Sequence, residues 1–264
     1  MKRAAAAMLL LAAVLAFRPL ASLYLEKRLI RVAGPGAATL QVPSEELSFD
    51  SGGRKLRGYW VPAGGPGLLI FHGNAESIAH WSEALALLHE AGIAAMVFDY
   101  SGYGASEGPA SLANFHQDAL AAWRVFREKL PRGRRACAYG LSLGSAVLLE
   151  VASELQPDCV VVTSSFLSVR EAAVVKRQIP RALMPFMPDA LDNLANAARF
   201  KGPLLVQHGT DDELFPVAWA KLLQAAHPGA RLEIIEGMHH ADPVAKPGAD
   251  NWGKAIGFVK AFDR

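Results

Sequence analysis

Short apolar runs alternate with longer amphipathic stretches along most of this chain of 264 residues. Continuous apolar runs of this kind are typical of parallel strands that are buried on both faces. We expect strands at residues 68–71, 93–98, 136–139, 160–163, 204–208 and 231–235. Apolar positions at helical spacing predict helices at residues 78–91, 111–129, 145–155, 217–226 and 251–262. Strands that alternate with helices predict an α/β fold with a mostly parallel, doubly wound sheet.

The pattern changes toward the N-terminus. Residues 46–49 and 57–61 alternate between polar and apolar positions, and Ser51-Gly52-Gly53 joins them, which predicts an antiparallel N-terminal hairpin. Residues 26–44 contain several glycines and prolines and are typical of a linker. The main domain is therefore expected at residues 45–264.

Residues 1–25 form a leader that is first basic and then apolar. Its apolar run, residues 4–17, fits a signal peptide, and read through to residue 25 the segment is long enough to span a bilayer. We favour an uncleaved signal anchor over a signal peptide cleaved after Ala16, because no sharp A-x-A site is present. Lys2 and Arg3 favour a membrane-anchored protein with an exported body, which would be secreted or periplasmic if the leader is cleaved. An apolar helix of a soluble domain is the remaining alternative.

Charge and cysteine content exclude several classes of protein. The formal net charge is +2, and outside the leader 24 basic residues face 25 acidic ones, which argues against a nucleic-acid partner. Cys137 and Cys159 lie in apolar strand-like runs, where we expect buried free thiols, with a disulfide between neighbouring strands as the alternative. Neither cysteine has the spacing of a metal site, and the sequence indicates no metal and no cofactor.

A pentapeptide of the form G-x-S-x-G occurs twice, and its surroundings separate the two copies. Ser142 lies between a predicted strand and a predicted helix, as in a nucleophile elbow, where a sharp turn exposes the serine hydroxyl. The helix N-terminus that follows offers free N–H groups at the same point. Ser106 has no strand directly before it, and Gly108-Pro109 prevents a helix from starting after it. We therefore assign the nucleophile to Ser142 and expect Ser106 to be a loop residue.

The last two predicted strands end in residues that complement a serine nucleophile. Asp211 and Asp212 follow one strand, and His239 and His240 follow the next. Because the carboxyl ends of parallel strands meet at one edge of the sheet, we expect these side chains to lie near Ser142. A histidine takes and returns the serine proton near neutral pH, and a carboxylate orients the histidine. The chain order Ser, Asp, His is that of α/β-hydrolases.

Four motifs in this order, FHGNA, DYSGYGASEG, GLSLG and HGTDDELFP, resemble those of the membrane-anchored serine hydrolases of the α/β-hydrolase superfamily. That group includes eukaryotic protein depalmitoylases and many bacterial relatives. The resemblance covers about residue 45 to the C-terminus and implies an α/β-hydrolase fold with a small cap at residues 166–201. Within that cap, Met184, Phe186 and Met187 are candidates to line an acyl pocket, or else they pack on the body.

The resemblance also selects among the candidate site residues. It places the catalytic acid at Asp212 and the base at His240. The family usually has a glycine where this chain has His239, so His239 stays an alternative. For the oxyanion hole, the backbone N–H of Leu143 is one expected donor, and the resemblance points to Asn74 for the other.

The sequence therefore predicts a metal-independent serine hydrolase that cleaves carboxylic ester or thioester bonds through an acyl-enzyme. The resemblance and the leader favour an acyl or lipid-like substrate. A peptidase of the prolyl-aminopeptidase-like type is the alternative among enzymes, although the short cap argues against it. A catalytically silent hydrolase fold used for binding at the membrane is the alternative outside enzymes.

Overall fold

A computed structural model of the chain describes residues 21, 23–24, 26–36, 40–187 and 190–262. The strands are β1 Glu45–Ser51, β2 Arg54–Val61, β3 Gly67–Phe71, β4 Ala94–Phe98, β5 Ala136–Leu141, β6 Cys159–Thr163, β7 Leu204–Gly209 and β8 Arg231–Ile235. The helices are α2 Ser82–Glu90, α3 Leu112–Lys129, α4 Leu143–Leu155, α5 Val169–Val175, α6 Asn193–Arg199, α7 Val217–Ala226, α8 Asp242–Ala245 and α9 Ala249–Lys260, with 3-10 helices η1 Ile78–Trp81 and η2 Arg181–Phe186.

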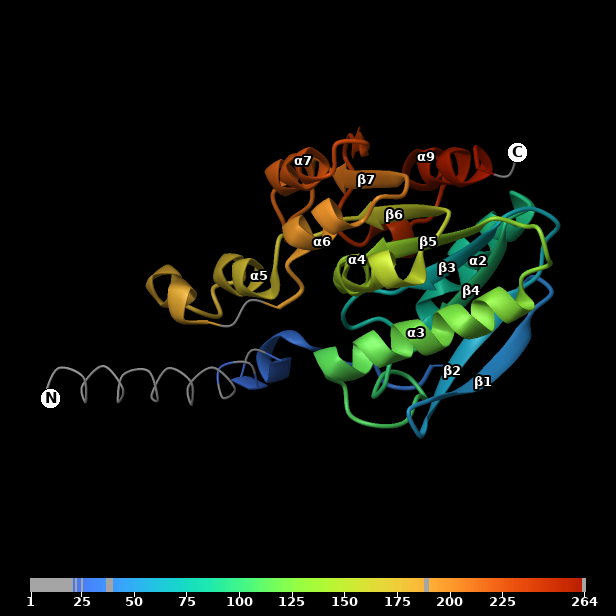
Figure 1. The fold of residues 1–264 in the computed structure, drawn as a ribbon, viewed down its shortest axis with the longest axis horizontal. Helices are drawn as coiled ribbons and strands as arrows, with labels where there is room; N and C mark the ends of the chain where they lie inside the picture. The colour runs from blue at the N-terminus through green and yellow to red at the C-terminus, as the bar shows by residue number, and fades with distance from the viewer. Residues whose placement is uncertain (1–20, 22, 25, 37–39, 188–189, 263–264) are drawn as a thin grey trace, which may run out of the picture.

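The strands of the described residues form one sheet in the order β1-β2-β4-β3-β5-β6-β7-β8 (Figure 1). β2 pairs antiparallel with β1 and with β4, and every later pair is parallel. The predicted fold class, a mostly parallel sheet with an antiparallel start, is confirmed. All residues of β3, β4, β5 and β6 are buried, as their continuous apolar sequences require in a sheet covered on both faces.

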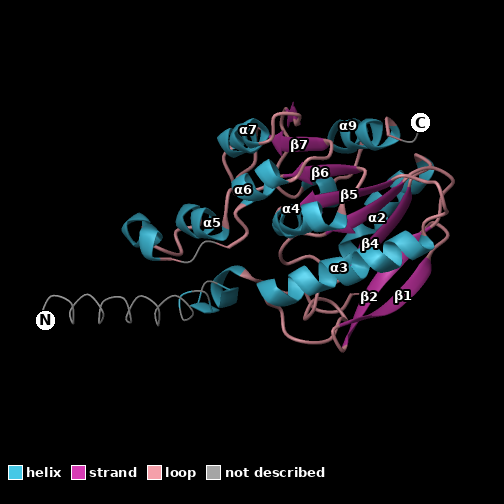
Figure 2. Ribbon diagram, viewed as in Figure 1, coloured by secondary structure: helices cyan, strands magenta, loops and turns pink. Residues whose placement is uncertain are grey.

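Helices cover both faces of the sheet and enclose a separate apolar cluster on each (Figure 2). On one face α3, α4, α6 and α7 pack around side chains such as Phe126 and Val147. On the other face α2 and α9 pack around Leu85 and Trp252. Each large apolar side chain buried in this way contributes about 1.5–3 kcal/mol to folding. The sheet is therefore held rigidly, and the ends of its strands can hold side chains in fixed positions.

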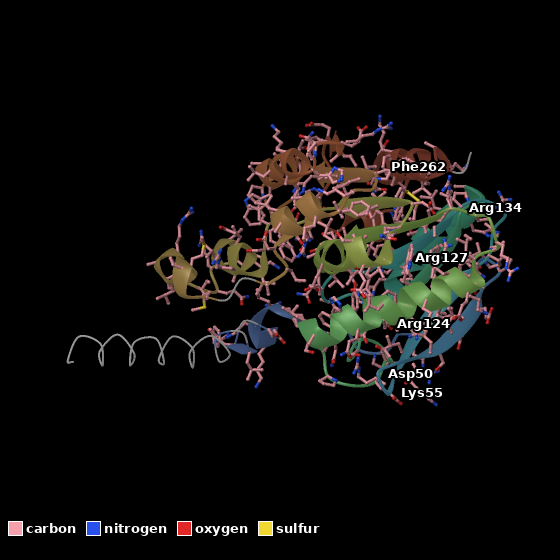
Figure 3. The ribbon with its side chains drawn as sticks, in the orientation of Figure 1. Asp50, Lys55, Arg124, Arg127, Arg134 and Phe262 are labelled. Carbon is pink, nitrogen blue, oxygen red and sulfur yellow. A yellow bond between two sulfur atoms is a disulfide. The ribbon has the colours of Figure 1, made fainter. Side chains whose placement is uncertain are left out.

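The two cysteines form a disulfide between neighbouring strands, drawn in yellow in Figure 3. Cys137 on β5 and Cys159 on β6 are register partners, with Cα atoms 4.6 Å apart. The expectation of free thiols is therefore wrong, because the strand register, which the sequence does not reveal, places the two side chains opposite each other. The bridge joins residues 22 positions apart. For a loop of this length the chain-entropy model gives a stabilisation of about 3 kcal/mol.

The residues that precede the main domain are attached to it. The described residues among 21–29 are helical, and Ala21 is buried in the cluster around α3 and α4. Residues 1–20, on which most of the leader prediction rests, lie outside the described residues. In the part of the chain that the structure describes, no helix is long and apolar enough to cross a membrane.

Candidate active site

Ser142 lies in the turn between β5 and α4, with φ 52° and ψ −112°, a conformation that non-glycine residues seldom adopt. Its N–H donates to the Thr163 carbonyl oxygen on β6 at 3.0 Å, and the Ser145 hydroxyl donates to the Ser142 carbonyl oxygen at 2.6 Å. Gly144 makes the turn possible, because a Cβ at this position would lie 1.9 Å from the Phe71 carbonyl oxygen at the end of β3. The predicted strand–turn–helix arrangement is thus present, and it holds the serine against the neighbouring strand.

Side chains from two other strand ends meet Ser142. His240, after β8, has Nε2 2.9 Å from the Ser142 Oγ. Its Nδ1 lies 2.9 Å from Oδ2 and 3.0 Å from Oδ1 of Asp212, which follows β7. Ser142 and His240 are each only 8% exposed, so bulk water does not compete strongly for these contacts. This geometry can pass a proton from the serine hydroxyl to the imidazole and stabilise the resulting positive charge.

Asp212 is held as a carboxylate by its surroundings. Burial acts to raise its pKa, but the hydrogen bond and charge of His240 and the backbone donors outweigh it, so the pKa lies below its ordinary value. The backbone donors are the N–H groups of Leu214 and Phe215, each 2.9 Å from Oδ1. Because both donors belong to the turn that carries Asp212, the carboxylate cannot rotate away from His240 without losing them.

The neighbouring alternatives point away from the serine. Asp211 accepts a hydrogen bond from the Thr210 hydroxyl at 3.0 Å. The His239 side chain is 54% exposed, and its Nδ1 lies 3.6 Å from a carboxylate oxygen of Glu213. His239 does not have a positive φ, whereas Gly237 does, with φ 69°. His239, which stands where the family usually has a glycine, therefore introduces no backbone strain.

Ser106, the serine of the second G-x-S-x-G copy, braces a loop. Its hydroxyl donates to the Asp99 carbonyl oxygen at 2.7 Å and accepts from the Arg57 N–H at 2.9 Å. Both contacts join the loop to the antiparallel part of the sheet. The prediction that Ser106 is a loop residue is consistent with this placement.

The two predicted oxyanion donors lie beside the serine. Leu143 is the first residue of α4, where a backbone N–H has no acceptor within the helix. Asn74 belongs to the loop after β3, and its N–H has no acceptor among the described residues. Both residues line a pocket together with Ser142. Their role as donors stays a prediction.

That pocket encloses about 510 Å³ of empty space, part of which is open to solvent. Its walls are mainly apolar: they include Leu29, Ile30, Leu112, Phe166, Val169, Ala172 and Phe215. Glu26 and Lys176 are the charged residues in its lining. Of the cap residues considered from the sequence, Met184 and Met187 are absent from the described lining, and the Phe186 side chain lies outside what the structure describes.

One wall of the pocket comes from residues 29–36, which we call the N-terminal strap. The side chain of Asn74 fastens it: Nδ2 donates to the Leu29 carbonyl oxygen at 2.6 Å, and Oδ1 accepts from the Arg31 N–H at 2.8 Å. Backbone bonds from Ala75 N–H to Arg31 O and from Gly104 N–H to the strap add to this attachment. The segment expected to be a linker, residues 26–44, therefore includes a stretch bonded to the loops around the site.

Two acidic residues that sequence reasoning did not single out for this role, Glu76 and Asp99, support the loop that carries Asn74. Glu76 Oε2 accepts from the Gly73 N–H at 2.8 Å and from the Trp81 indole at 3.1 Å. Asp99 Oδ1 accepts from the Ile78 N–H at 2.8 Å. Burial raises the pKa of Glu76 to about 7 and that of Asp99 to about 6. No periodic pattern marks Glu76, because it lies in the irregular segment between β3 and η1.

We expect the Glu76→Gln variant to lose part of the pH dependence of stability. Because the pKa of Glu76 is raised on folding, the folded protein binds more protons than the unfolded chain between about pH 4 and pH 7, so wild-type stability falls as the pH rises through that window. Glutamine keeps an acceptor oxygen and has no charge to bury. The variant should melt roughly 5 °C above wild type at pH 8 and close to wild type at pH 5. Thermal melts at the two pH values test this, and an equal pH dependence in both proteins would contradict it.

The strand order, the turn at Ser142 and the histidine and aspartate that meet it form the arrangement of an α/β-hydrolase. A family model described as "Serine aminopeptidase, S33" matches residues 67–195. Among the described residues, no group of three or more His, Cys, Asp or Glu side chains is placed to hold a metal ion.

Sequence and structure comparisons give several proteins that are similar to this chain. An uncharacterized protein of Mycobacterium tuberculosis is 30% identical over 204 residues, 72% of this chain and 70% of that protein. Alpha/beta hydrolase domain-containing protein 17C of Mus musculus is 27% identical over 232 residues, 80% of this chain and 71% of that protein. The structure of an esterase from Pyrococcus furiosus superposes with a TM-score of 0.70 at 17% identity, over 89% of this chain and 99% of that chain. The chain belongs to the α/β-hydrolase superfamily, which supports hydrolase activity as its general function.

Proposed function

We propose that this protein is a serine hydrolase that cleaves carboxylic ester or thioester bonds. The observation that carries the proposal is the continuous hydrogen-bonded chain from the Ser142 hydroxyl through His240 to Asp212. A serine hydroxyl is a weak nucleophile unless a base removes its proton, and His240 Nε2 is within hydrogen-bonding distance of that proton.

In the proposed mechanism, Ser142 Oγ attacks the carbonyl carbon while His240 takes the serine proton. The negative charge that develops on the carbonyl oxygen is stabilised by the N–H groups of Leu143 and Asn74. His240 then gives its proton to the departing oxygen or sulfur, which leaves an acyl group on Ser142. A water molecule, deprotonated by His240, attacks this acyl-enzyme, and the acid product leaves as the serine is restored. Asp212 keeps the Nδ1 proton of His240 in place throughout.

The pocket supports an acyl group as the substrate part that binds beside the serine. Its lining between the strap and α5 is apolar, and apolar walls favour a hydrocarbon chain over a peptide backbone, whose polar groups would lose their hydrogen bonds to water. We therefore propose an acyl or lipid-like substrate. The aminopeptidase alternative has the matching family description in its favour, together with Glu26 in the lining, since a carboxylate can bind an α-amino group.

A substrate panel tests the proposal. We expect the wild-type protein to hydrolyse p-nitrophenyl esters and S-acyl thioesters, with a preference for chains longer than acetyl, and to be labelled by a fluorophosphonate that reacts with active-site serines. Faster turnover of aminoacyl and prolyl naphthylamides than of any ester would favour the peptidase alternative. A protein that is inert on the whole panel and refuses the label would be the silent binding fold.

We further propose that the domain is exported and held at a membrane by the leader. The basic and apolar sequence of residues 1–25 supports this, and so does the Cys137–Cys159 disulfide, because such bonds persist in oxidising compartments. Alkylation of thiols during lysis of the cells under denaturing, non-reducing conditions provides the measurement: both cysteines should stay unmodified unless a reductant is added first. Two cysteines that are alkylated without a reductant would contradict export.

A further inference from the structure

Exposed apolar side chains gather on two segments of this protein. Of the seven large hydrophobic residues that are exposed in the described part of the chain, five lie within residues 21–36 and 169–186, which we call the rim segments. They are Leu23, Tyr24, Val32, Val175 and Leu183. Each is at least 40% exposed. The other two, Leu222 and Ile234, lie apart from them on α7 and β8.

The rim segments meet at the mouth of the pocket. Leu29 and Ile30 from the first segment and Val169 and Ala172 from the second line the same pocket as Ser142. Figure 1 shows the helical residues before the strap and the α5–η2 region projecting at the same end of the molecule. In Figure 3 the side chains of α5 and η2 extend from the end opposite the labelled Arg134 and Phe262. Five of the exposed apolar side chains therefore belong to the two segments that supply walls of the pocket and that project at one end of the molecule.

The rim segments are also the basic part of the protein. Residues 21–36 contain three cations and one anion, and residues 169–186 contain four cations and one anion, which gives a formal net charge of +5. Because the whole chain has a net charge of +2, the remainder carries −3. Apolar side chains flanked by lysine and arginine are the composition of surfaces that lie in the headgroup region of anionic bilayers.

The sequence that precedes the first rim segment also favours a lipid bilayer as the surface that the rim segments contact. The first rim segment follows directly on residues 1–20, whose sequence is apolar apart from Lys2, Arg3 and Arg18. A leader of this composition partitions into lipid. Leu23 and Tyr24 follow these residues closely in the sequence. A bilayer that holds the leader would therefore lie next to them.

We propose that the rim segments dock on an anionic lipid bilayer, so that the pocket opens at the membrane surface. The apolar side chains of Leu23, Tyr24, Val175 and Leu183 enter the headgroup region, while the neighbouring cations contact lipid phosphates. The docking itself does not depend on the proposed function, but its consequence for catalysis rests on it. If the protein hydrolyses acyl substrates, an acyl chain would pass from the bilayer into the pocket without crossing water. The substrate class would then be acyl groups that are inserted in a membrane.

A fluorescent probe at one rim position tests the docking. In the full chain, Leu183→Cys and the control Leu222→Cys are labelled with an environment-sensitive dye; the native cysteines are buried and disulfide-bonded and do not compete for it. The two leucines are similarly exposed, at 44% and 49%, and Leu222 lies outside the rim segments on α7. With vesicles of phosphatidylcholine and phosphatidylglycerol, we expect a blue shift and quenching by spin-labelled lipids at position 183 and neither effect at 222.

Three results would overturn the proposal. A probe at position 183 that stays as exposed to water as the one at 222 shows that the leader alone holds the protein. Equal quenching at both positions shows non-specific adsorption. A probe at 183 that is shielded but is not quenched by spin-labelled lipids shows that another part of the chain covers the rim.

Activity provides a second measurement. The Leu183→Asp variant should hydrolyse soluble p-nitrophenyl acetate like wild type and a vesicle-embedded long-chain thioester several-fold more slowly. Arg181→Glu should bind anionic vesicles several-fold more weakly and change little on vesicles of phosphatidylcholine alone. If wild type hydrolyses no ester at all, the proposed function fails, while the probe measurement still decides whether the rim docks. Equal loss on the soluble and the embedded substrate would contradict a docking role.

Discussion

The Ser142→Ala variant is expected to lose roughly 10⁴-fold or more in kcat on the preferred ester. The methyl group leaves no atom to form the acyl-enzyme, and the remaining rate comes from binding and from whatever oxyanion stabilisation persists. The fold should be preserved, because alanine keeps the Cβ and the backbone contacts of the turn. Steady-state kinetics and the fluorophosphonate label, with a thermal melt to check folding, provide the measurement.

Ser106→Ala is the matched control, because Ser106 occupies the same sequence pattern without the strand and helix around it. Its loss removes the hydrogen bonds to Asp99 and Arg57, so a modest decrease in stability is expected together with activity within a few-fold of wild type. If both alanine variants keep their activity, another nucleophile is at work. If Ser106→Ala alone is inactive, the assignment of the elbow is wrong.

The second large effect is expected from Asp212→Asn, a decrease in kcat of about 10⁴-fold. The asparagine oxygen would take the place of Oδ1, which accepts from the Leu214 and Phe215 N–H groups, and its NH₂ would then face His240. An NH₂ at this position requires an unprotonated Nδ1, so the proton moves to Nε2. His240 in that tautomer cannot accept the proton of Ser142. We expect KM to change little, because Asp212 does not line the pocket.

Asp211→Asn gives the control, since Asp211 is the adjacent residue with an exposed side chain whose partner is Thr210. This variant should retain activity near wild type over the same pH range. A large loss in Asp211→Asn with a small one in Asp212→Asn would reverse the assignment. A large rise in KM with unchanged kcat in Asp212→Asn would mean that the residue binds substrate and does not orient the histidine.

The arrangement at Ser142 was accessible from the sequence because its determinants are local. Strand β5, Ser142 and helix α4 with its Gly144 lie within one short stretch of sequence. Asp212 and His240 each follow a predicted strand, and the ends of those strands share one edge of the sheet with Ser142. The choice between His239 and His240 could be made only from the resemblance to the family. Both residues are histidines, and the sequence does not show which of the two side chains faces the serine. In the structure, only His240 faces the serine.

Features that depend on contacts between residues far apart in the chain could not be predicted from the sequence. Asn74 and Arg31 are separated by 43 positions, and a glycine- and proline-rich stretch has the same composition whether it is free or bonded to a loop. The Cys137–Cys159 bridge depends on the register between β5 and β6, which is fixed by packing of the whole sheet. Glu76 lies in an irregular loop, where neither helical nor strand periodicity predicts which side chains are buried.

The N-terminal strap bears on how this protein should be produced in the laboratory. A shortened version that begins at Glu45, where the main domain was expected to start, retains every strand that the structure describes together with Ser142, Asp212 and His240. It lacks Leu29 and Ile30, however, and so it lacks one wall of the pocket and the two strap contacts of the Asn74 side chain, while the Tyr103 hydroxyl still donates to Asn74 Oδ1. The acyl-chain preference measured with this shortened version would therefore be that of a pocket wider than the natural one. Expression for substrate profiling should therefore begin upstream of Ala21, in detergent if the leader requires it.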